Sequence, residues 1–135
     1  MERKWSDGAW EAARPVYEKI LEHPFVKGLA DGSLPEQRFD FYLHQDVLYV
    51  RSYARRLLAL ASRMPRRRQQ VDFTTFASDG VAMEEIMHQS FLKGYDPTPD
   101  EMSPACLLYT SVLDAQMLEA TEVAAASVLP CFWVY

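Results

Sequence analysis

One helical stretch of this chain carries an acid and aromatic side chains where a core helix normally carries Leu, Ile and Val. The members of this stripe are Phe39, Tyr42, Asp46, Tyr49 and Tyr53. Successive members are three or four residues apart, so on a 3.6-residue period they share one face. A buried carboxylate needs a hydrogen-bond partner or a counter-charge. The stripe therefore predicts a small-molecule pocket inside a helical bundle. The alternative for Asp46 is a structural ion pair with an arginine of a neighbouring helix, and we expect Tyr42 and Tyr53 to serve core packing.

Cys131 is a candidate for covalent chemistry, since a thiolate is a nucleophile. It follows Pro130 directly, and a proline inside a helix removes one hydrogen bond and kinks the helix. If a new helical segment begins at Pro130, Cys131 lies in its first turn, where a thiolate is favoured. The other interpretation is an inert thiol, because free cysteines are commonly buried.

A second group of polar side chains, Glu84, Glu85 and His88, lies within one helical turn. The Glu85-x-x-His88 spacing is that of di-iron carboxylate bundles, which use two such pairs and further acids. This chain has one such pair, and a Glu84–His88 pair that stabilises its own helix is the favoured interpretation. We therefore expect no metal and no cofactor. A metal-dependent oxygenase remains the enzymatic alternative.

The elements that must position these residues are all helical in pattern. No stretch alternates with period two over enough residues to form a strand, so we expect an all-α fold in a single domain over residues 1–135. Six helices are predicted, over residues 7–22, 24–31, 35–63 and 66–92, then from residue 104 and from residue 119.

The predicted helix ends follow from capping residues and prolines. Asp7 caps the first helix, in which Pro15 predicts a kink or a later start. Ser33 and Glu36 form a capping box. Ser103 caps the fifth helix, and Pro130 interrupts the sixth. In the fourth helix the predicted buried residues are Val71, Phe76, Met83, Met87 and Phe91.

Composition restricts the class of protein. The 135 residues are 49% hydrophobic with a net charge of −5, which provides material for a core and argues against a nucleic-acid binder. The basic cluster formed by Arg63 and residues 66–68 is expected to be a solvated turn. The first residues are charged and no apolar run reaches membrane-spanning length, so we expect no signal peptide and no membrane span. Cys106 and Cys131 fit no metal or disulfide spacing, so we expect a reduced, cytoplasmic location and no membrane partner.

Several short segments, in this order, resemble the thiaminase II (TenA) family of thiamine-salvage enzymes. They are His23-Pro24-Phe25-Val26 with Asp31-Gly32-Ser33-Leu34-Pro35, then Gln45-Asp46-Val47-Leu48-Tyr49, Tyr109-Thr110-Ser111, and Leu129-Pro130-Cys131-Phe132-Trp133-Val134-Tyr135. The resemblance implies a haem-oxygenase-like helical bundle, assembled as a homotetramer. It also implies hydrolysis of aminopyrimidines, either 4-amino-5-aminomethyl-2-methylpyrimidine or thiamine itself, to the hydroxymethyl pyrimidine.

The resemblance also implies roles for individual residues. Cys131 takes the place of the nucleophile, Asp46 that of the acid that holds the aminopyrimidine edge, and Tyr49, Tyr109 and Tyr135 line the pocket. The family's remaining tyrosine and its catalytic glutamate lie beyond Tyr135. Because the sequence ends on an apolar run without a stop signal, we expect it to be part of a longer protein. A pyrimidine-binding or regulatory module without catalysis is the non-enzymatic alternative.

Overall fold

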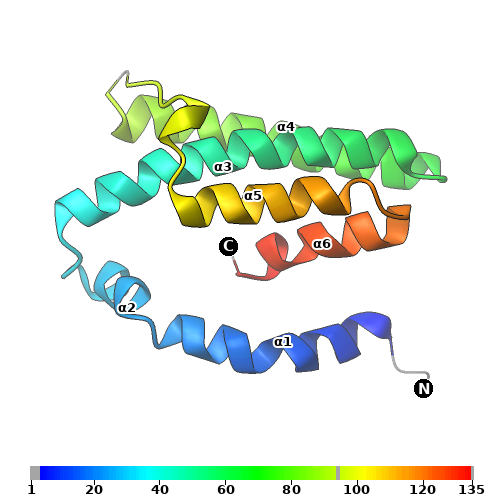
Figure 1. The fold of residues 1–135 in the computed structure, drawn as a ribbon, viewed down its shortest axis with the longest axis horizontal. Helices are drawn as coiled ribbons and strands as arrows, with labels where there is room; N and C mark the ends of the chain where they lie inside the picture. Colours follow the sequence, from blue (N-terminus) through cyan, green and yellow to red (C-terminus); the bar gives the residue numbers. More distant parts are fainter. Residues whose placement is uncertain (1–3, 94, 135) are drawn as a thin grey trace. The chain divides into compact units, whose positions relative to one another are not determined.

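The computed structural model describes residues 4–93 and 95–134, and every regular element in this part of the chain is helical (Figure 1). The predicted all-α fold is therefore confirmed. The contacts divide the chain into a first unit that ends at Phe39 and a second that begins at Asp40. A single domain over residues 1–135 stays a prediction.

The first unit contains α1, Trp5–Leu21, and α2, Pro24–Asp31. Helix α1 begins before Asp7, so this residue is not the cap; its carboxylate accepts a bond of 3.2 Å from the backbone N–H of Lys4. The helix continues through Pro15, so the later start was wrong. Helix α2 begins and ends as predicted. The His23 ring accepts a hydrogen bond from the Phe25 N–H, and Gly32 ends the helix at a φ of 78°, where a side chain would be strained.

The link to the next helix differs from the predicted capping box. Helix α3, Glu36–Arg63, begins after Pro35, so Ser33 lies too early to cap it. The backbone N–H of Ser33 instead donates to the Asp31 carboxylate at 2.9 Å. Ser33 therefore belongs to the turn that closes α2, a local Asx-type bond that competes with capping.

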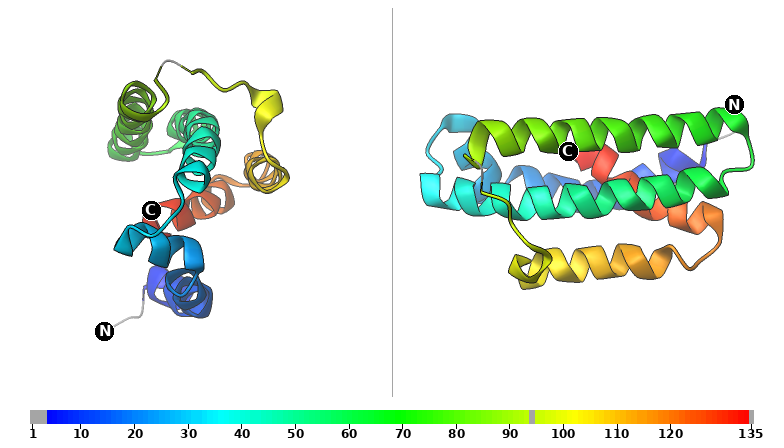
Figure 2. Two further views of the ribbon diagram at one scale, coloured as in Figure 1. Left: turned by 90° about the vertical axis from the view of Figure 1, so that its left-hand side faces the viewer. Right: turned by 90° about the horizontal axis from the view of Figure 1, so that it is seen from above.

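Helix α3 is the central element of the second unit, with the other helices of that unit around it (Figures 1 and 2). These are α4, Arg67–Phe91, then the 3-10 helix η1, Pro99–Glu101, and the helices α5, Pro104–Gln116, and α6, Thr121–Val134. The core lies where they meet. It contains Tyr49, Tyr53, Leu57, Leu60 and Met64 of α3, Ala77 of α4, Leu113 of α5, and Ala124 and Val128 of α6.

Helix α4 matches its predicted range within one residue at each end, but the prediction of its buried face was wrong. Val71, Phe76, Met83 and Phe91 are exposed, Met87 is half-buried, and Ala77 and Glu84 are the buried residues of the helix. Small residues decide the contact with α3. A Cβ added at Gly80 would lie in ordinary van der Waals contact, at 4.0 Å, with the side chains of Val50 and Ala54. The backbones approach along this small-residue side, which leaves the larger apolar side chains on the other faces.

Helices α5 and α6 bring the remaining site residues to α3. The Ser103 side chain caps α5 as predicted, by accepting a hydrogen bond from the Cys106 N–H. The predicted interruption of α6 was wrong, because the helix continues through Pro130. Its buried residues Ala124 and Val128 pack in the core, and the Tyr53 hydroxyl donates to the Val128 carbonyl at 2.7 Å. These contacts hold the helix in place where the proline removes a bond.

The turn between α3 and α4 is only partly solvated. Residues 66–68 are exposed, as predicted for this basic cluster. Arg63 instead donates to the carbonyl of Met117 at 2.7 Å and to that of Glu119, so it caps the end of α5. Over the described residues, no helix is both long enough and apolar enough to span a lipid bilayer.

Candidate functional site

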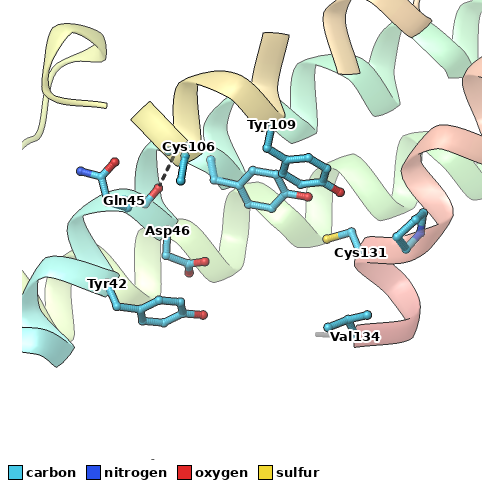
Figure 3. A pocket seen from close by; sticks show the side chains of 10 residues that line it. Tyr42, Gln45, Asp46, Cys106, Tyr109, Cys131 and Val134 are labelled. Atoms are coloured by element: carbon cyan, nitrogen blue, oxygen red, sulfur yellow. Dashed lines mark hydrogen bonds between the residues drawn. The ribbon is translucent and has the colours of Figure 1, made fainter. Parts of the chain in front are cut away.

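A pocket of about 380 Å³ lies between α3, α5 and α6, within the second unit (Figure 3). Its volume is in the range of small-molecule sites. The lining residues are Tyr42, Gln45, Asp46, Tyr49, Ala105, Cys106, Tyr109, Pro130, Cys131 and Val134. The structure thus brings together the four described residues predicted to form a site, Asp46, Tyr49, Tyr109 and Cys131. The fifth, Tyr135, lies outside the described residues.

Asp46 is the buried acid of this pocket, and its side chain points into it from α3 (Figure 3). Burial raises the pKa of the Asp46 carboxyl to about 6, and a hydrogen bond with Tyr42 partly offsets that effect. Burial and the neighbouring Asp46 charge raise the pKa of Tyr42 to about 12, so its hydroxyl stays protonated and able to donate. Because the carboxylate is held at a cost in free energy, the pocket favours a ligand that brings hydrogen-bond donors or positive charge to it.

No arginine contributes to the pKa shift of Asp46, which argues against the structural ion pair with a neighbouring helix, and the arginines that follow Asp46 on α3 itself are engaged elsewhere. Arg51 contacts Glu84 at 2.8 Å and Asp96 at 2.7 Å. Arg56 is buried, contacts Asp114 at 2.7 Å and donates to the Thr110 carbonyl at 2.8 Å. Burial, and not a neighbouring cation, is the dominant influence on the pKa of Asp46.

Cys131 reaches the pocket from the opposite side, near the end of α6 (Figure 3). Because α6 continues through Pro130, the prediction that Cys131 lies in a first helical turn was wrong. Burial raises the pKa of the thiol, hydrogen bonds with Tyr49 and Tyr53 lower it, and the Asp46 charge raises it further. The resting side chain is therefore a protonated thiol, and a bound ligand must favour the thiolate before Cys131 can act as a nucleophile.

Three tyrosines connect the two sides of the pocket. The rings of Tyr49 and Tyr109 stack with centroids 5.4 Å apart, and Tyr49 also contacts Tyr53 at 5.4 Å. Burial is the first cause of the raised pKa of the Tyr49 hydroxyl, and its neighbours Cys131 and Tyr109 raise that pKa further. Tyr49 and Tyr53 both lower the pKa of Cys131, and the Tyr53 hydroxyl also donates to the Val128 carbonyl.

Among the lining residues that the sequence interpretation missed, three carry polar or thiol side chains. Tyr42 was assigned to core packing, yet it lines the pocket and hydrogen-bonds Asp46. Its position one turn before Asp46 on the same face was the available signal. Gln45 and Cys106 were not selected. Cys106 lies one turn before Tyr109, so a helix that presents one presents the other.

The predicted pair of Glu84 with His88 is replaced by a contact between helices. Arg51 Nε donates to the buried Glu84 carboxylate at 2.9 Å, whereas Glu85 accepts from Gln89 at 2.5 Å. The acids of this turn are thus engaged by protein donors. Among the residues that the structure describes, no group of three His, Cys, Asp or Glu side chains is arranged to hold a metal ion.

Comparison with known proteins places this chain in a family. The sequence profile of the TENA/THI-4/PQQC family matches residues 10–135. Over 129 residues the chain is 40% identical to the thiamine biosynthesis multifunctional protein ThiED of Corynebacterium efficiens, covering 93% of this chain and 18% of that protein. It is 34% identical over 133 residues to the aminopyrimidine aminohydrolase of Halalkalibacterium halodurans, covering 93% of this chain and 59% of that one.

A further aminopyrimidine aminohydrolase, that of Bacillus subtilis, is 29% identical over 142 residues, which cover 98% of this chain and 58% of the relative. The chain thus spans somewhat less than two thirds of the length of these two aminohydrolases, and under a fifth of the ThiED protein.

Proposed function

The chain belongs to the TENA/THI-4/PQQC family, and from this premise we propose that its pocket binds an aminopyrimidine and hydrolyses it at the exocyclic methylene. The substrate is 4-amino-5-aminomethyl-2-methylpyrimidine or thiamine, and the product is the hydroxymethyl pyrimidine. The observation that carries this proposal is the buried Asp46 carboxylate, which shares one aromatic pocket with the thiol of Cys131.

Asp46 is suited to the edge of an aminopyrimidine ring. That edge presents an exocyclic amine beside a ring nitrogen, so one carboxylate can accept from the amine and share a proton with the nitrogen. The pKa of about 6 keeps Asp46 mostly ionised at neutral pH, yet close enough to titration to share that proton. Tyr42 donates to the same carboxylate and limits its rotation. Tyr49 and Tyr109 offer ring faces for stacking.

Cys131 acts as the nucleophile in this proposal. Its sulfur adds to an electron-poor ring carbon, and the ring nitrogen held by Asp46 accepts the displaced electron pair together with a proton. The amine then leaves the exocyclic methylene with its bonding pair and is released as ammonia once protonated. Water adds to the methylene, and the thiol is expelled from the ring. The sum is one water consumed, with one hydroxymethyl pyrimidine and one ammonia formed. Tyr49 stabilises the sulfur while it carries charge.

Protonation of the leaving amine requires an acid. The resemblance assigns this step to a glutamate outside the present sequence, so binding and turnover are separate questions for this chain. A chain that binds the ring without releasing ammonia is the non-catalytic alternative. The metal-dependent oxygenase has less support, because Gln89 donates to the Glu85 carboxylate on which it depended. Assembly as a homotetramer stays a prediction from the resemblance.

Calorimetric titration with 4-amino-5-hydroxymethyl-2-methylpyrimidine tests the binding half of the proposal. We expect saturable binding at one site per chain, and much weaker binding of the matched pyrimidine without the 4-amino group, which cannot donate to Asp46. Ammonia release from the aminomethyl compound tests turnover. Equal affinity for the two pyrimidines, or no binding of either, contradicts the proposed role of the pocket.

A further inference from the structure

Gln45 is a lining residue with two hydrogen bonds to the backbone of another element. Its Nε2 donates to the Glu101 carbonyl at 2.9 Å, and its Oε1 accepts from the Ser103 N–H at 2.7 Å. One side-chain amide thus holds two backbone groups that lie more than 50 positions further along the chain. These groups flank the point where the connection from α4 enters α5.

This contact reaches the wall of the pocket through the cap of α5. Ser103 is the N-cap of α5 and accepts from the Cys106 N–H at 3.3 Å. The Cys106 thiol in turn lies 3.8 Å from the backbone carbonyl of Gln45 (Figure 3). The first turn of α5 is therefore bonded to the turn of α3 that carries Asp46. Cys106 and Tyr109 project from this part of α5 into the pocket.

Two other side chains of α3 bond to the segment that connects α4 to α5 and to α5 itself. Arg51 contacts Asp96 and donates to the Pro97 carbonyl at 3.3 Å, so it holds the start of the connection. Arg56 contacts α5 further toward its C-terminal end, at Thr110 and Asp114. Of these three α3 side chains, only Gln45 bonds to the residues at the start of α5. Without these bonds, the first turn of α5 can move about the Arg56 contact and change the separation between Asp46 and the α5 wall.

We propose that Gln45 is a positioning residue for the aminopyrimidine site, where it sets the spacing between Asp46 and the wall formed by Cys106 and Tyr109. The inference rests on the proposed function. A planar ring stacked on Tyr109 reaches Asp46 only at one wall spacing, and a shift near 1 Å at such a site can cost about 100-fold in rate. Gln45 acts on the ligand through α5 and is not assigned a catalytic step.

The test uses a Cys131→Ser background, in which Cys106 is the only cysteine of the chain. Gln45→Met removes both amide bonds and keeps a side chain of similar length, whereas Gln45→Glu keeps an acceptor for Ser103 but loses the donor to Glu101. Gln70→Met is the matched control, since Gln70 also donates to a backbone carbonyl, that of Met64 at 2.8 Å, away from the pocket.

Two measurements are made on each variant. The first is the rate at which a neutral maleimide labels Cys106 without ligand, and the second is calorimetric affinity for 4-amino-5-hydroxymethyl-2-methylpyrimidine. For Gln45→Met we expect Cys106 to be labelled several-fold faster and the pyrimidine to bind about tenfold more weakly. This loss is smaller than the loss of about 100-fold in rate that a full 1 Å displacement can cause. Gln45→Glu should be intermediate in labelling, and Gln70→Met should change neither measurement.

Each other outcome overturns the proposal. Weaker binding with unchanged labelling means that Gln45 contacts the ligand directly. Equal effects of Gln45→Met and Gln70→Met mean general loosening of the fold. No effect in either measurement removes Gln45 from the site. If the Cys131→Ser parent and the unmodified chain both fail to bind the pyrimidine, the proposed function fails, and the labelling comparison still decides whether Gln45 holds the entrance of α5.

Discussion

Replacement of Asp46 by Asn should stabilise the ligand-free protein at neutral pH. Burial raises the pKa of the Asp46 carboxyl from 3.8 to about 6. Because the folded chain holds this proton more tightly than the unfolded chain does, ionisation of Asp46 opposes folding. This cost is absent below about pH 4, grows between about pH 4 and 6, and is complete above about pH 6. The difference between the two pKa values corresponds to a loss of about 3 kcal/mol in the free energy of unfolding at neutral pH.

The assay is urea unfolding followed by far-ultraviolet circular dichroism, with the unmodified chain and Asp46→Asn compared at pH 4.5 and 7.5. About 2 kcal/mol of the total should develop between these two values. The stability advantage of Asp46→Asn over the unmodified chain should therefore grow by this amount as the pH rises. Asp40→Asn is the matched control, because Asp40 is an exposed acid on the same helix, and its difference from the unmodified chain should stay nearly constant.

The same variant should lose affinity for the pyrimidine, since a neutral amide cannot serve as the charged acceptor for the ring edge. If the variant is more stable but binds the pyrimidine more weakly, Asp46 lowers the stability of the free protein and is needed for ligand binding. The reasoning is refuted if Asp46→Asn is less stable than the unmodified chain at pH 7.5, or if its advantage does not change with pH. Unchanged pyrimidine affinity refutes the anchor role alone.

Further predictions concern the α6 side of the pocket. Cys131→Ser should bind the pyrimidine and lose ammonia release by at least about 100-fold in any form of the protein that turns over, because the serine hydroxyl is a far weaker nucleophile; retention of the rate removes Cys131 from the chemistry. Tyr53→Phe should lower the free energy of unfolding by about 1 kcal/mol, since it removes the buried hydrogen bond to Val128. Urea titration checks this value, with Tyr17→Phe on α1 as a control that should change it little.

Much of the helical framework was predictable from sequence because its signals are local. Helix α2 spans its predicted range, α3 ends at Arg63 as predicted, and Ser103 begins α5 as predicted. Capping was less predictable where two local bonds compete. Ser33 could cap α3 or close the turn after α2, and the structure has it bonded to Asp31. Hydropathy also failed on α4, where small residues select the face turned to α3.

The sequence by itself determined that Asp46 and Tyr49 share one helical face, since that follows from a 3.6-residue period alone. Which side chains complete the pocket depended on tertiary packing. Tyr42 could have entered the core, and Cys106 was inconspicuous until α5 was placed beside α3. Tertiary structure also decided the state of Cys131. Packing against Tyr53 carries α6 through Pro130, and burial, which depends on every neighbouring helix, raises the pKa of the thiol. A spacing rule describes one helix, whereas protonation depends on everything packed around the group.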